Sequence, residues 1–367
     1  MRFMCATLAA VLAAGAVTAD DGFRPLFNGK DLSGWVAVNN APGTFTVRDG
    51  LIVTTGKPTG FLRSERMFEN FVVELEWKHV HPKGNSGVFV WADPLPAVGV
   101  PFARAIEVQV LDGHETKNYT SHGDVFSIWG ATMTPDRPHP AGWARCLPSE
   151  RRSKPAGQWN HYRIECRDGV LKLAVNGKVV SGGSRCSPRK GYLALEAEGS
   201  ECHYRNLRIK ELPSTNPKEG EIADDRTGFV TLFTGLDLAG WKADDAGGWK
   251  ALPGPNILRH DGAKAGTLRT DATFSDFELI VDYRSTGKGA ATLLLRGVEG
   301  GKVPLDGTTG KGWSRYEIRL AGNRLVVKLN GKTVLANRLD QLPARGPIGL
   351  HADGAAEFTN LFVRELK

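Results

Sequence analysis

The residues best suited to acid–base chemistry are concentrated in one block of the chain, residues 79–158, which holds five of the nine histidines. Within this block, apolar and polar residues alternate over positions 105–111, and this period of two predicts a β-strand. One side of the strand would pack into a core, and the other would carry Glu107 and Gln109. The strand leads directly into Asp112. Carboxylates so placed can take or give protons, and an amide can hold a hydroxyl.

A second polar group follows in the turn His122-Gly123-Asp124. An imidazole and a carboxylate beside aromatic residues can act as general acid and base. We therefore take Glu107, Asp112, His122 and Asp124 as catalytic candidates. Oxygen and imidazole ligands also suit several divalent cations, so Glu107, Asp112 and His122 are candidate ligands for a divalent metal cofactor. Their spacing matches no fixed ligand pattern, and no particular metal is predicted.

Neighbouring residues have the chemistry of a carbohydrate-binding surface. Amide and guanidinium groups donate hydrogen bonds to hydroxyls, and indole rings offer a flat apolar face to a sugar. The candidate substrate-binding residues are Gln109, Arg104, Asn85, Trp91 and Trp129. The alternative is that the alternating polar residues form only a solvated strand face, and that His122 is an ordinary loop histidine.

The elements that must position these residues are β-strands. Helical periodicity is nearly absent, whereas a period of two recurs between turns of Gly, Asn and Asp. Residues 71–78 place apolar side chains on one face and charged side chains on the other. Residues 171–180 form a hairpin around Asn176-Gly177, a pair that suits a tight turn with positive φ. Many short strands with frequent turns predict an all-β protein built from β-sandwiches.

The chain also contains a degenerate internal repeat. The opening segment Phe27–Trp35 returns as Phe233–Trp241, 206 residues later, and Trp159 is matched by Trp313, 154 residues later. The offset falls by 52 residues, so the first copy carries a block that the second lacks. That block holds the catalytic candidates, and sites are often grafted onto a shared fold. We expect the second copy to keep the scaffold without the site.

These patterns divide the chain into segments. We expect a signal peptide over residues 1–19, a first sandwich over 22–212, a linker over 213–227, and a second, shorter sandwich over 228–367. The linker is rich in Pro, Lys, Glu and Asp, which predicts an exposed, semi-flexible segment.

The expected signal peptide combines Arg2, an apolar run and small residues before a cleavage point near Ala19. We therefore expect export to a periplasm or to the exterior. No later stretch approaches about 18 apolar residues, so no membrane span is expected. The formal net charge is +7, but the basic residues are scattered without interleaved aromatic residues, so a nucleic-acid partner is not expected.

Four cysteines remain after the expected cleavage, all in the first copy. An even number in an oxidising compartment favours disulfides. Of the three pairings that four cysteines allow, we expect Cys166 with Cys202 and Cys146 with Cys186. A zinc site is disfavoured because no pair of cysteines is separated by two residues.

The first copy resembles the 3-keto-disaccharide hydrolase domain family over nearly its whole length. The second copy resembles the family at its ends and in its hairpin, and departs from it in the middle. The resemblance in the first copy is carried by Leu26–Trp35, Asn85–Phe89, Glu107–Asp112, Gly157–Asn160 and Tyr204–Leu207.

This resemblance implies a fold similar to the concanavalin A-like lectins and glucanases, here as two jelly rolls in tandem. It also implies cleavage of glycosides already oxidised at C3 of the sugar. A ketone at C3 acidifies the hydrogen on C2, so a base can remove that proton and the C1 leaving group can depart by elimination. Water then adds to the product. The expected ligand is thus an oxidised glycoside, such as a 3-keto-disaccharide.

The resemblance also suggests roles for individual residues. Glu107 would be the base or a metal ligand, and Gln109 would orient sugar hydroxyls. His122 and Asp124 would serve as acid or ligand. Arg104 would stabilise the enolate that forms at O3.

Two other functions compete with this one. A lectin-like sandwich can bind carbohydrate without catalysis, and this is the main alternative. A retaining glucanase of the same fold is disfavoured. Such an enzyme needs two carboxylates about 5–5.5 Å apart, usually presented as Glu-x-Asp-x-x-Glu, and no Glu in this chain is followed two residues later by Asp.

Overall fold

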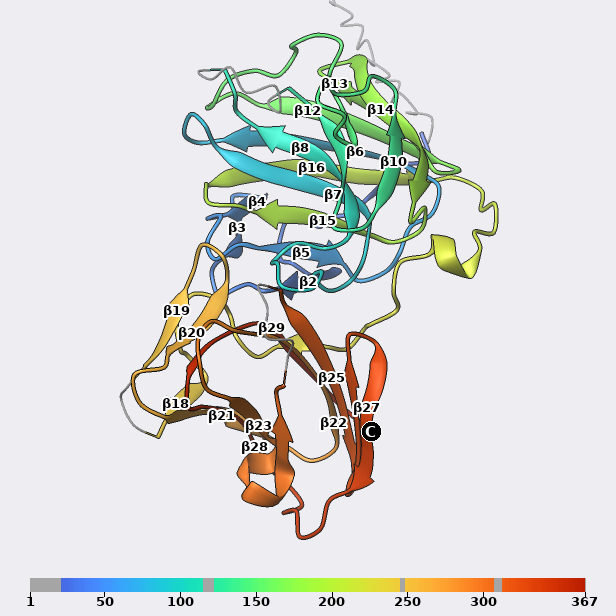
Figure 1. Cartoon of the computed structure of the whole chain (residues 1–367). Coiled ribbons are helices and arrows are strands. Elements are labelled where there is room, and N and C mark those ends of the chain that lie inside the picture. The colour runs from blue at the N-terminus through green and yellow to red at the C-terminus, as the bar shows by residue number, and fades with distance from the viewer. Residues whose placement is uncertain (1–20, 115–121, 245–247, 307–311, 367) are drawn as a thin grey trace, which may run out of the picture.

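A computed structural model describes residues 21–114, 122–244, 248–306 and 312–366 (Figure 1). The expected signal peptide lies outside these residues. The described chain forms two lobes, an N-terminal one built from β1 to β16 and a C-terminal one built from β17 to β29. No α-helix occurs in the described parts, and three short 3-10 helices are η1 (Glu219–Glu221), η2 (Leu295–Gly297) and η3 (Glu299–Gly301). None of the described helices is long and apolar enough to cross a membrane.

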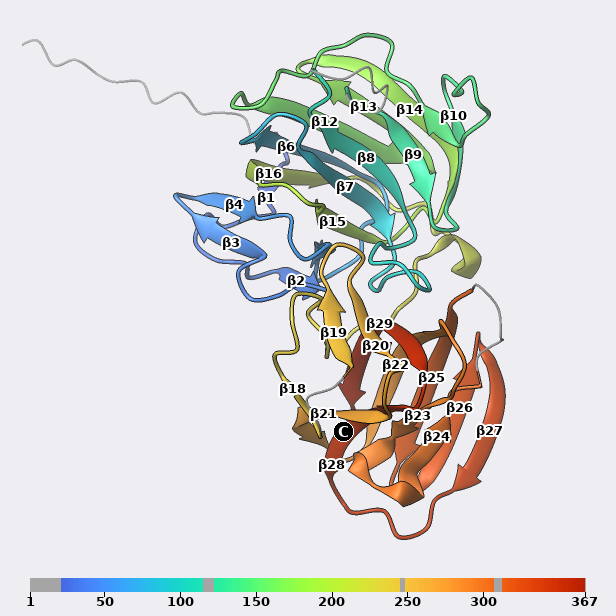
Figure 2. The ribbon, with the colours of Figure 1, turned by 60° about the vertical axis from the view of Figure 1, so that its left-hand side comes forward.

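Two antiparallel sheets make up the N-terminal lobe (Figure 2). The nine-stranded sheet contains β10 (Thr132–Pro135), β14 (Lys178–Ser187), β13 (Val170–Val175), β12 (Asn160–Arg167), β6 (Phe71–His79), β16 (Cys202–Glu211), β4 (Leu51–Thr54) and β3 (Phe45–Arg48) in spatial order, and β1 (Arg24–Pro25) pairs with β16. The seven-stranded sheet contains β11 (Arg145–Cys146), β9 (Val125–Ile128), β8 (Ala105–Leu111), β7 (Asn85–Ala92), β15 (Tyr192–Ala197), β5 (Gly60–Ser64) and β2 (Trp35–Val38) in spatial order.

The C-terminal lobe repeats this arrangement with fewer strands. Its eight-stranded sheet contains β19 (Trp249–Leu252), β20 (Ile257–Asp261), β29 (Ala355–Glu365), β22 (Phe277–Ser285), β25 (Ser314–Ala321), β26 (Arg324–Leu329) and β27 (Lys332–Arg338) in spatial order, and β17 (Val230–Thr231) pairs with β29. Its five-stranded sheet contains β18 (Trp241–Ala243), β21 (Gly266–Phe274), β28 (Gly346–Ala352), β23 (Ala291–Leu294) and β24 (Lys302–Pro304). The predicted all-β sandwich class is confirmed.

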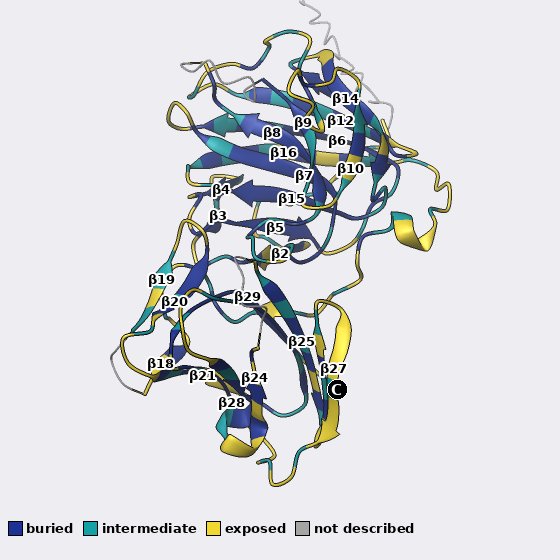
Figure 3. Ribbon diagram, viewed as in Figure 1, coloured by how far each residue is buried: buried dark blue, intermediate teal, exposed yellow. Residues whose placement is uncertain are grey.

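Alternating side chains build a separate core between the sheets of each lobe. In the N-terminal lobe, Val73 and Leu75 of β6 face Val108 and Val110 of β8 across one continuous apolar cluster. A second cluster around Phe277 and Phe358 fills the C-terminal lobe. Figure 3 shows these strands as largely buried, whereas β27 at the sheet edge is mostly exposed. Burial of apolar surface at about 25 cal/mol per Å² is the main force holding such sandwiches together.

A third apolar cluster joins the two lobes. Phe61 and Phe89 of the seven-stranded sheet pack with Ile280 and Phe362 of the C-terminal lobe. These phenylalanines lie on the face of the seven-stranded sheet that points away from the N-terminal core. Figures 1 and 2 show β2 and β5 next to the C-terminal lobe. The C-terminal lobe therefore covers one end of this outer sheet face.

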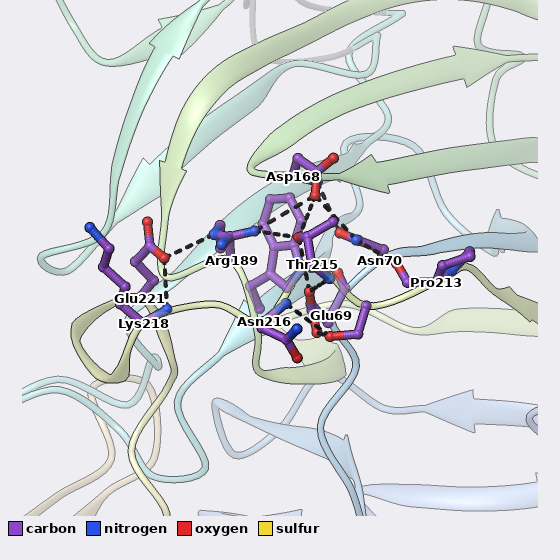
Figure 4. Close-up of polar contacts among 11 residues, drawn as sticks. Glu69, Asn70, Asp168, Arg189, Pro213, Thr215, Asn216, Lys218 and Glu221 are labelled. Atoms are coloured by element: carbon purple, nitrogen blue, oxygen red, sulfur yellow. Dashed lines mark hydrogen bonds and ion pairs between the residues drawn. The ribbon is translucent and has the colours of Figure 1, made fainter.

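The segment between the lobes is bound to the N-terminal lobe along much of its length (Figure 4). The Thr215 amide donates to Glu69 at 2.7 Å, its hydroxyl donates to Asp168 at 2.5 Å, and Arg189 binds Glu221 at 3.1 Å. Farther on, the Ala223 amide donates to the carbonyl of Lys190 at 2.7 Å. The path of the chain into the C-terminal lobe is thus set by specific contacts.

The cysteine pairing predicted from the sequence is wrong, because all four described cysteines are buried and free. Cys166 is paired in register with Phe71 and Cys202 with His79, at opposite ends of β6. At about 3.3 Å per residue these sites are far beyond the roughly 7 Å limit for bridged Cα atoms. Cys146 and Cys186 do not bridge either. The Cys146 thiol lies 3.4 Å from the Gly182 amide, and Cys186 stands four residues farther along β14.

Candidate functional site

The candidate site lies on the outer face of the seven-stranded sheet, where β8, β7 and β15 run side by side. Ile106, Val108 and Val110 point into the core, as the alternation predicts. The intervening Glu107 and Gln109 point to the outer face, yet they are only 6% and 5% exposed. The solvated-face alternative therefore does not apply, because a solvated face would leave these side chains open to water.

Two carboxylates converge over a glycine in this face. A Cβ on Gly87 would stand 2.9 Å from Oε1 of Glu107 and 2.9 Å from Oε2 of Glu196. The two carboxylate oxygens are therefore no more than twice that distance apart. Glu107 reaches this point from β8 and Glu196 from β15, with β7 between them. Only glycine leaves the space that both groups occupy.

The rest of the Asn85-Ser86-Gly87 segment fixes the neighbours of these carboxylates. The Gln109 amide donates to Oδ1 of Asn85 at 2.6 Å, and the Asn85 amide donates to Glu198. Ser86 points inward, donates to the Glu196 carbonyl at 2.6 Å, and lies 2.5 Å from the Tyr204 hydroxyl. Each residue of the segment thus has a distinct part in holding the site.

These groups line a hollow of about 480 Å³, which we call the carboxylate hollow. That volume is within the roughly 300–1,000 Å³ usual for small-molecule sites. Its polar side is formed by Glu107, Glu196 and Glu198 with Asn85, Gln109 and Arg145. Its apolar wall is formed by Phe102, Phe126, Ile128 and Trp129. A polar floor beside aromatic groups is the composition expected of a carbohydrate site.

Burial controls the protonation of these carboxyls. Loss of solvation, reinforced by the negative charge of Glu198, raises the pKa of Glu107 to about 8. Burial and the charges of Glu107 and Glu198 raise the pKa of Glu196 well above its usual value. Glu196 is also hydrogen-bonded to Glu198, so it is the protonated partner of that pair. At neutral pH the cluster therefore holds protons that ordinary surface carboxyls would have lost.

Arg145 is the positive charge of the carboxylate hollow. Its guanidinium lies 4.2 Å from the centre of the Phe126 ring, and its charge acts on both Glu107 and Asp124. An arginine that packs over an aromatic ring stays positively charged, and its guanidinium N–H groups can still donate hydrogen bonds to anionic groups. It stands where negative charge on a bound ligand would be stabilised.

Asp124 is placed beside Gln109, because the Gln109 amide donates to the Asp124 carbonyl at 2.9 Å. Its side chain is fully buried, and both carboxylate oxygens lack a hydrogen-bond partner among the described residues. Burial raises the pKa of Asp124 to about 7, although Arg145 opposes this shift. Asp124 thus extends the buried acidic face, although it does not line the carboxylate hollow.

Asp112 and His122 belong to a different cluster. Asp112 accepts hydrogen bonds from the amides of His114 and Ala156, each at 3.2 Å, and so holds two loop segments together. The His122 imidazole lies 2.5 Å from the Ser153 hydroxyl and packs edge-on against His114. Burial, with the positive charges of His114 and Arg151, lowers the pKa of His122 to about 4, which keeps its ring neutral.

The structure does not bring the three candidate metal ligands, Glu107, Asp112 and His122, together. Asp112 lies beyond the end of β8, five positions from Glu107, or roughly 16 Å along an extended chain. Among the described residues, no three His, Cys, Asp or Glu side chains come together in a way that could hold a metal ion. The sequence places these residues near each other, but the strand direction separates them.

Two predicted sugar-binding residues have other roles. Trp91 is fully buried in the core and donates from its indole to the Glu69 carbonyl at 2.7 Å. Alternation along β7 would turn Trp91 outward, but a shift of register near the end of the strand and a φ of 53° turn it inward. Arg104 pairs with Asp93 through two hydrogen bonds of 2.8 Å, which directs it away from the carboxylate hollow. Asn85, Gln109 and Trp129 do line that hollow, as expected.

The sequence reasoning missed Glu196, Glu198 and Arg145. The missed signal was in β15 and just after it, where Glu196-Ala197-Glu198 ends a strand that is otherwise apolar. A charged residue at a buried position of a central strand is rare unless it has a function. Arg145 is more difficult to predict, because it reaches the site through a strand of only two residues, β11.

Comparison with known proteins places this chain in a family. The model of the 3-keto-alpha-glucoside-1,2-lyase-like domain matches residues 22–210 and 299–364. The chain therefore belongs to the 3-keto-alpha-glucoside-1,2-lyase-like domain family, and the resemblance stated from its motifs is confirmed. Among curated proteins, it is 25% identical over 242 residues to a 3-keto-disaccharide hydrolase of Bacteroides thetaiotaomicron, covering 52% of this chain and 79% of that protein.

Solved structures with similar parts include a candidate glycosyl hydrolase from Parabacteroides distasonis. It is 23% identical, with a TM-score of 0.40, and the match covers 52% of this chain and 94% of that one. Another is the carbohydrate-binding module CBM66 from Bacillus subtilis, which is 13% identical, with a TM-score of 0.36 and coverages of 48% and 96%.

Proposed function

We propose that the N-terminal lobe cleaves glycosides whose sugar carries a ketone at C3. The observation that carries this proposal is the convergence of Glu107 and Glu196 over Gly87, where both carboxyl pKa values are raised and the hydrogen bond to Glu198 keeps Glu196 protonated. A pair of carboxyls with unequal pKa values can supply a base and an acid in one site. Family membership and the named activity of the Bacteroides relative indicate the substrate class.

In the proposed reaction, ionised Glu107 removes the proton from C2 of the 3-keto sugar. The electrons of the C2–H bond form an enolate with its charge on O3. When the enolate collapses, a double bond forms between C1 and C2, and the bond from C1 to the leaving oxygen breaks. Glu196 gives its proton to that oxygen, so the products are an unsaturated ketone and a free alcohol or sugar. Addition of water across the new double bond then yields the 3-keto sugar.

The neighbouring groups have supporting roles in this scheme. Arg145 offers the positive charge that would stabilise the enolate, a role that the sequence had suggested for Arg104. The Gln109–Asn85–Glu198 chain of hydrogen bonds would hold sugar hydroxyls. Burial raises the pKa of Glu198, and its hydrogen bonds with Asn85 and Glu196 oppose this shift by favouring the ionised form. A site closed on one side by aromatic rings excludes water, which strengthens each of these charges.

The C-terminal lobe is proposed to be a degenerate second copy without this chemistry. In the corresponding stretch of β28, His351 stands where β15 carries Glu196, and Asp353 stands where Glu198 follows β15. The His351 ring lies 2.9 Å from the Thr267 hydroxyl, and the Asp353 carboxylate accepts from the Ala290 amide. The strand that corresponds to β8 is β24, which pairs with β23 as β8 pairs with β7. Its residues are Lys302, Val303 and Pro304, so it has no counterpart of Glu107 and cannot form the pair of converging carboxylates.

We also propose that the protein is exported after removal of residues 1–19. The support is the sequence pattern of Arg2, the apolar run and the small residues near Ala19. The mass of the mature protein, compared between cell fractions, tests this proposal. A chain that keeps residues 1–19 and stays in the cytoplasm would refute it.

The main experiment incubates the protein with a 3-keto-disaccharide and with its unoxidised parent, in D₂O. Elimination followed by hydration places one deuterium on C2 of the released sugar, whereas direct hydrolysis leaves the original hydrogen there. We expect cleavage of the oxidised substrate only, with deuterium at C2 above the level found without enzyme. Mass spectrometry and NMR of the product measure this directly.

Two variants and one control complete the test. Glu107→Gln and Glu196→Gln should each lower kcat at least a hundredfold, the order expected for loss of a general acid or base. Glu165→Gln is the matched control, because the Glu165 side chain is 43% exposed on β12 and pairs with Arg167 at 3.6 Å, away from the carboxylate hollow. Tight binding of both disaccharides without cleavage of either would instead favour a carbohydrate-binding function.

A further inference from the structure

A second hollow lies beside the carboxylate hollow, at the junction of the two lobes. It measures about 490 Å³, and its lining includes Val98, Arg104, Trp129, Asp224, Arg226 and Arg315. These residues come from the N-terminal lobe, the linker and the C-terminal lobe. We call it the junction hollow. Trp129 lines both hollows, so one indole separates them.

The loop that forms one side of the junction hollow is held by the C-terminal lobe. This loop, residues 93–104, leaves the sheet after β7 and returns at β8. Arg315 donates to the Pro96 carbonyl at 2.8 Å, and Asp282 accepts from the Gly99 amide at 2.9 Å. Asn360 donates to the carbonyls of Ala97 and Val100, each at 3.0 Å. The shape of the loop therefore depends on contacts from the other lobe.

The linker forms the opposite side and is fixed there by its own contacts. Its first part is bound to the N-terminal lobe through the network shown in Figure 4. It then passes the loop, where the Asp224 amide donates to Asp93 at 3.0 Å. Arg226 pairs with Glu317 of the C-terminal lobe at 2.5 Å. The junction hollow is thus bordered by residues with defined positions.

Trp129 has the exposure of a ligand-contacting residue. Its side chain is 49% exposed although it is among the largest apolar groups of the chain. It stacks on Phe102 with a ring separation of 6.3 Å and an angle of 10°. Its φ of 49° lies in the left-handed region because Trp129 and Gly130 form a tight turn, closed by the hydrogen bond from the Ala131 amide to the Ile128 carbonyl at 3.1 Å.

We propose that the junction hollow is a subsite for the second sugar unit of the glycoside, the part that leaves from C1. This proposal rests on the proposed function of the carboxylate hollow. With the oxidised ring over Glu107 and Glu196, the leaving unit extends across Trp129. The indole offers a stacking face, and the ion pair of Arg104 with Asp93 and the neighbouring Arg226 offer donors and acceptors to hydroxyls.

The C-terminal lobe therefore contributes to substrate recognition without catalytic groups of its own. It shapes the loop of residues 93–104, and it supplies Arg315 to the lining of the junction hollow. The neutral balance of paired Arg and Asp side chains fits an uncharged sugar unit better than a strongly acidic one. The chemical class of the ligand is a hydroxylated, uncharged carbohydrate ring.

The test fills the junction hollow without touching the carboxylates. Val98 is 43% exposed and lines only the junction hollow, so Val98→Trp adds bulk there at little risk to folding. Val334→Trp is the matched control, because Val334 is 57% exposed on β27 and lines neither hollow. KM is measured for a 3-keto-disaccharide and for methyl 3-keto-glucoside, which lacks the second sugar.

We expect Val98→Trp to raise the ratio of the disaccharide KM to the methyl glycoside KM at least tenfold, while Val334→Trp leaves that ratio at the wild-type value. An unchanged ratio in Val98→Trp would overturn the subsite. If the wild-type protein cleaves neither substrate, the proposed function fails, and calorimetry with the unoxidised disaccharide tests the subsite by itself. Tenfold weaker binding to Val98→Trp supports the subsite, and equal binding refutes it.

Discussion

Glu107 and Glu196 reach across the strand between them, and their carboxylate oxygens meet over Gly87 at 2.9 Å from the position a Cβ would take. This relationship explains why a glycine follows Asn85 and Ser86 in the middle of a buried strand. Glycine weakens a strand interior, so its presence there indicates a close approach by other groups. Here the approaching groups are the two carboxyls to which we assign proton transfer.

Replacing Gly87 with alanine should therefore separate the two carboxylates. The new methyl group would meet flexible side-chain ends, so the protein should fold while the carboxyls move apart. We expect kcat on a 3-keto-disaccharide to fall at least tenfold with little change in the melting temperature. Gly220→Ala is the control, because a Cβ at Gly220 has open space around it. Wild-type kcat in Gly87→Ala would show that the carboxylates need not converge.

The pH dependence of the reaction should follow Glu107. Since the pKa of Glu107 is raised to about 8, the base is protonated over most of the neutral range. We expect kcat/KM to rise about tenfold per pH unit below this value and to level above it. The rising limb reports the coupled carboxyl cluster as a whole rather than one residue. A profile that is flat between pH 6 and 9 would exclude a base with such a pKa.

Asp124 should lower the stability of the protein as the pH rises. Its pKa is raised from 3.8 to about 7 in the folded state, so the folded protein holds a proton that the unfolded chain releases. The stabilisation is present below the lower value and is lost as the pH passes the higher one. We expect Asp124→Asn to be more stable than wild type at pH 8 by roughly 1–3 kcal/mol, the order for a buried polar group without a partner.

Chemical denaturation at several pH values measures this difference, which should shrink towards pH 4. Asp168→Asn provides a comparison of opposite sign. Hydrogen bonds to the Asp168 carboxylate, led by that from Thr215, hold its pKa below the usual value, so Asp168 should stabilise the fold as the pH rises. If the free energies of unfolding of wild type and Asp124→Asn change in parallel with pH, Asp124 does not titrate as described.

The contact between the lobes can be tested with a pair of corresponding asparagines. Asn360 lies at the lobe junction, donates to Asp282 at 2.7 Å, and accepts from Asn39 at 2.9 Å. Asn206 has the same place on β16, but it is exposed and donates only to Glu76, at 3.2 Å. Their φ values, 51° and 53°, are nearly equal, so alanine strains the backbone to the same extent at both positions.

We expect Asn360→Ala to lower the free energy of unfolding by about 2–4 kcal/mol, because several buried groups lose their partners. Asn206→Ala should lower it by less than about 1 kcal/mol beyond the shared backbone effect, since water can replace an exposed hydrogen bond. Urea denaturation of both variants gives the comparison. Equal losses would mean that the junction network contributes nothing beyond local backbone geometry.

Thiol titration tests the state of the cysteines. Because Cys146, Cys166, Cys186 and Cys202 are buried and free, none should react quickly in the native protein and all four should react after denaturation. Burial also raises the pKa of Cys186 to about 12, which suppresses its reactive thiolate. The number of reactive thiols is measured with Ellman's reagent, before and after denaturation in the absence of a reductant. Fewer than four reactive thiols would reveal a disulfide.

The sequence by itself determined the class of fold and the strand on which the candidate site was sought. Alternation with a period of two is a local property, so it predicted the strands and the side of β8 that carries Glu107 and Gln109. The family motifs identified the family for the same reason, because they are read directly from consecutive residues. The block present only in the first copy directed attention to Asn85 and Trp129, both of which line the carboxylate hollow.

Tertiary structure decided which of these residues meet. Glu107 and Glu196 are 89 positions apart in the chain and converge only because β7 lies between their strands. Asp112 is close to Glu107 in sequence but is carried away by the extended backbone, which advances about 3.3 Å per residue. The cysteine pairs fail for the same reason. Residues a few positions apart along one strand are separated by the extended backbone, whereas residues on adjacent strands lie side by side however distant they are in sequence. The order of strands in a sheet is not encoded in the local sequence.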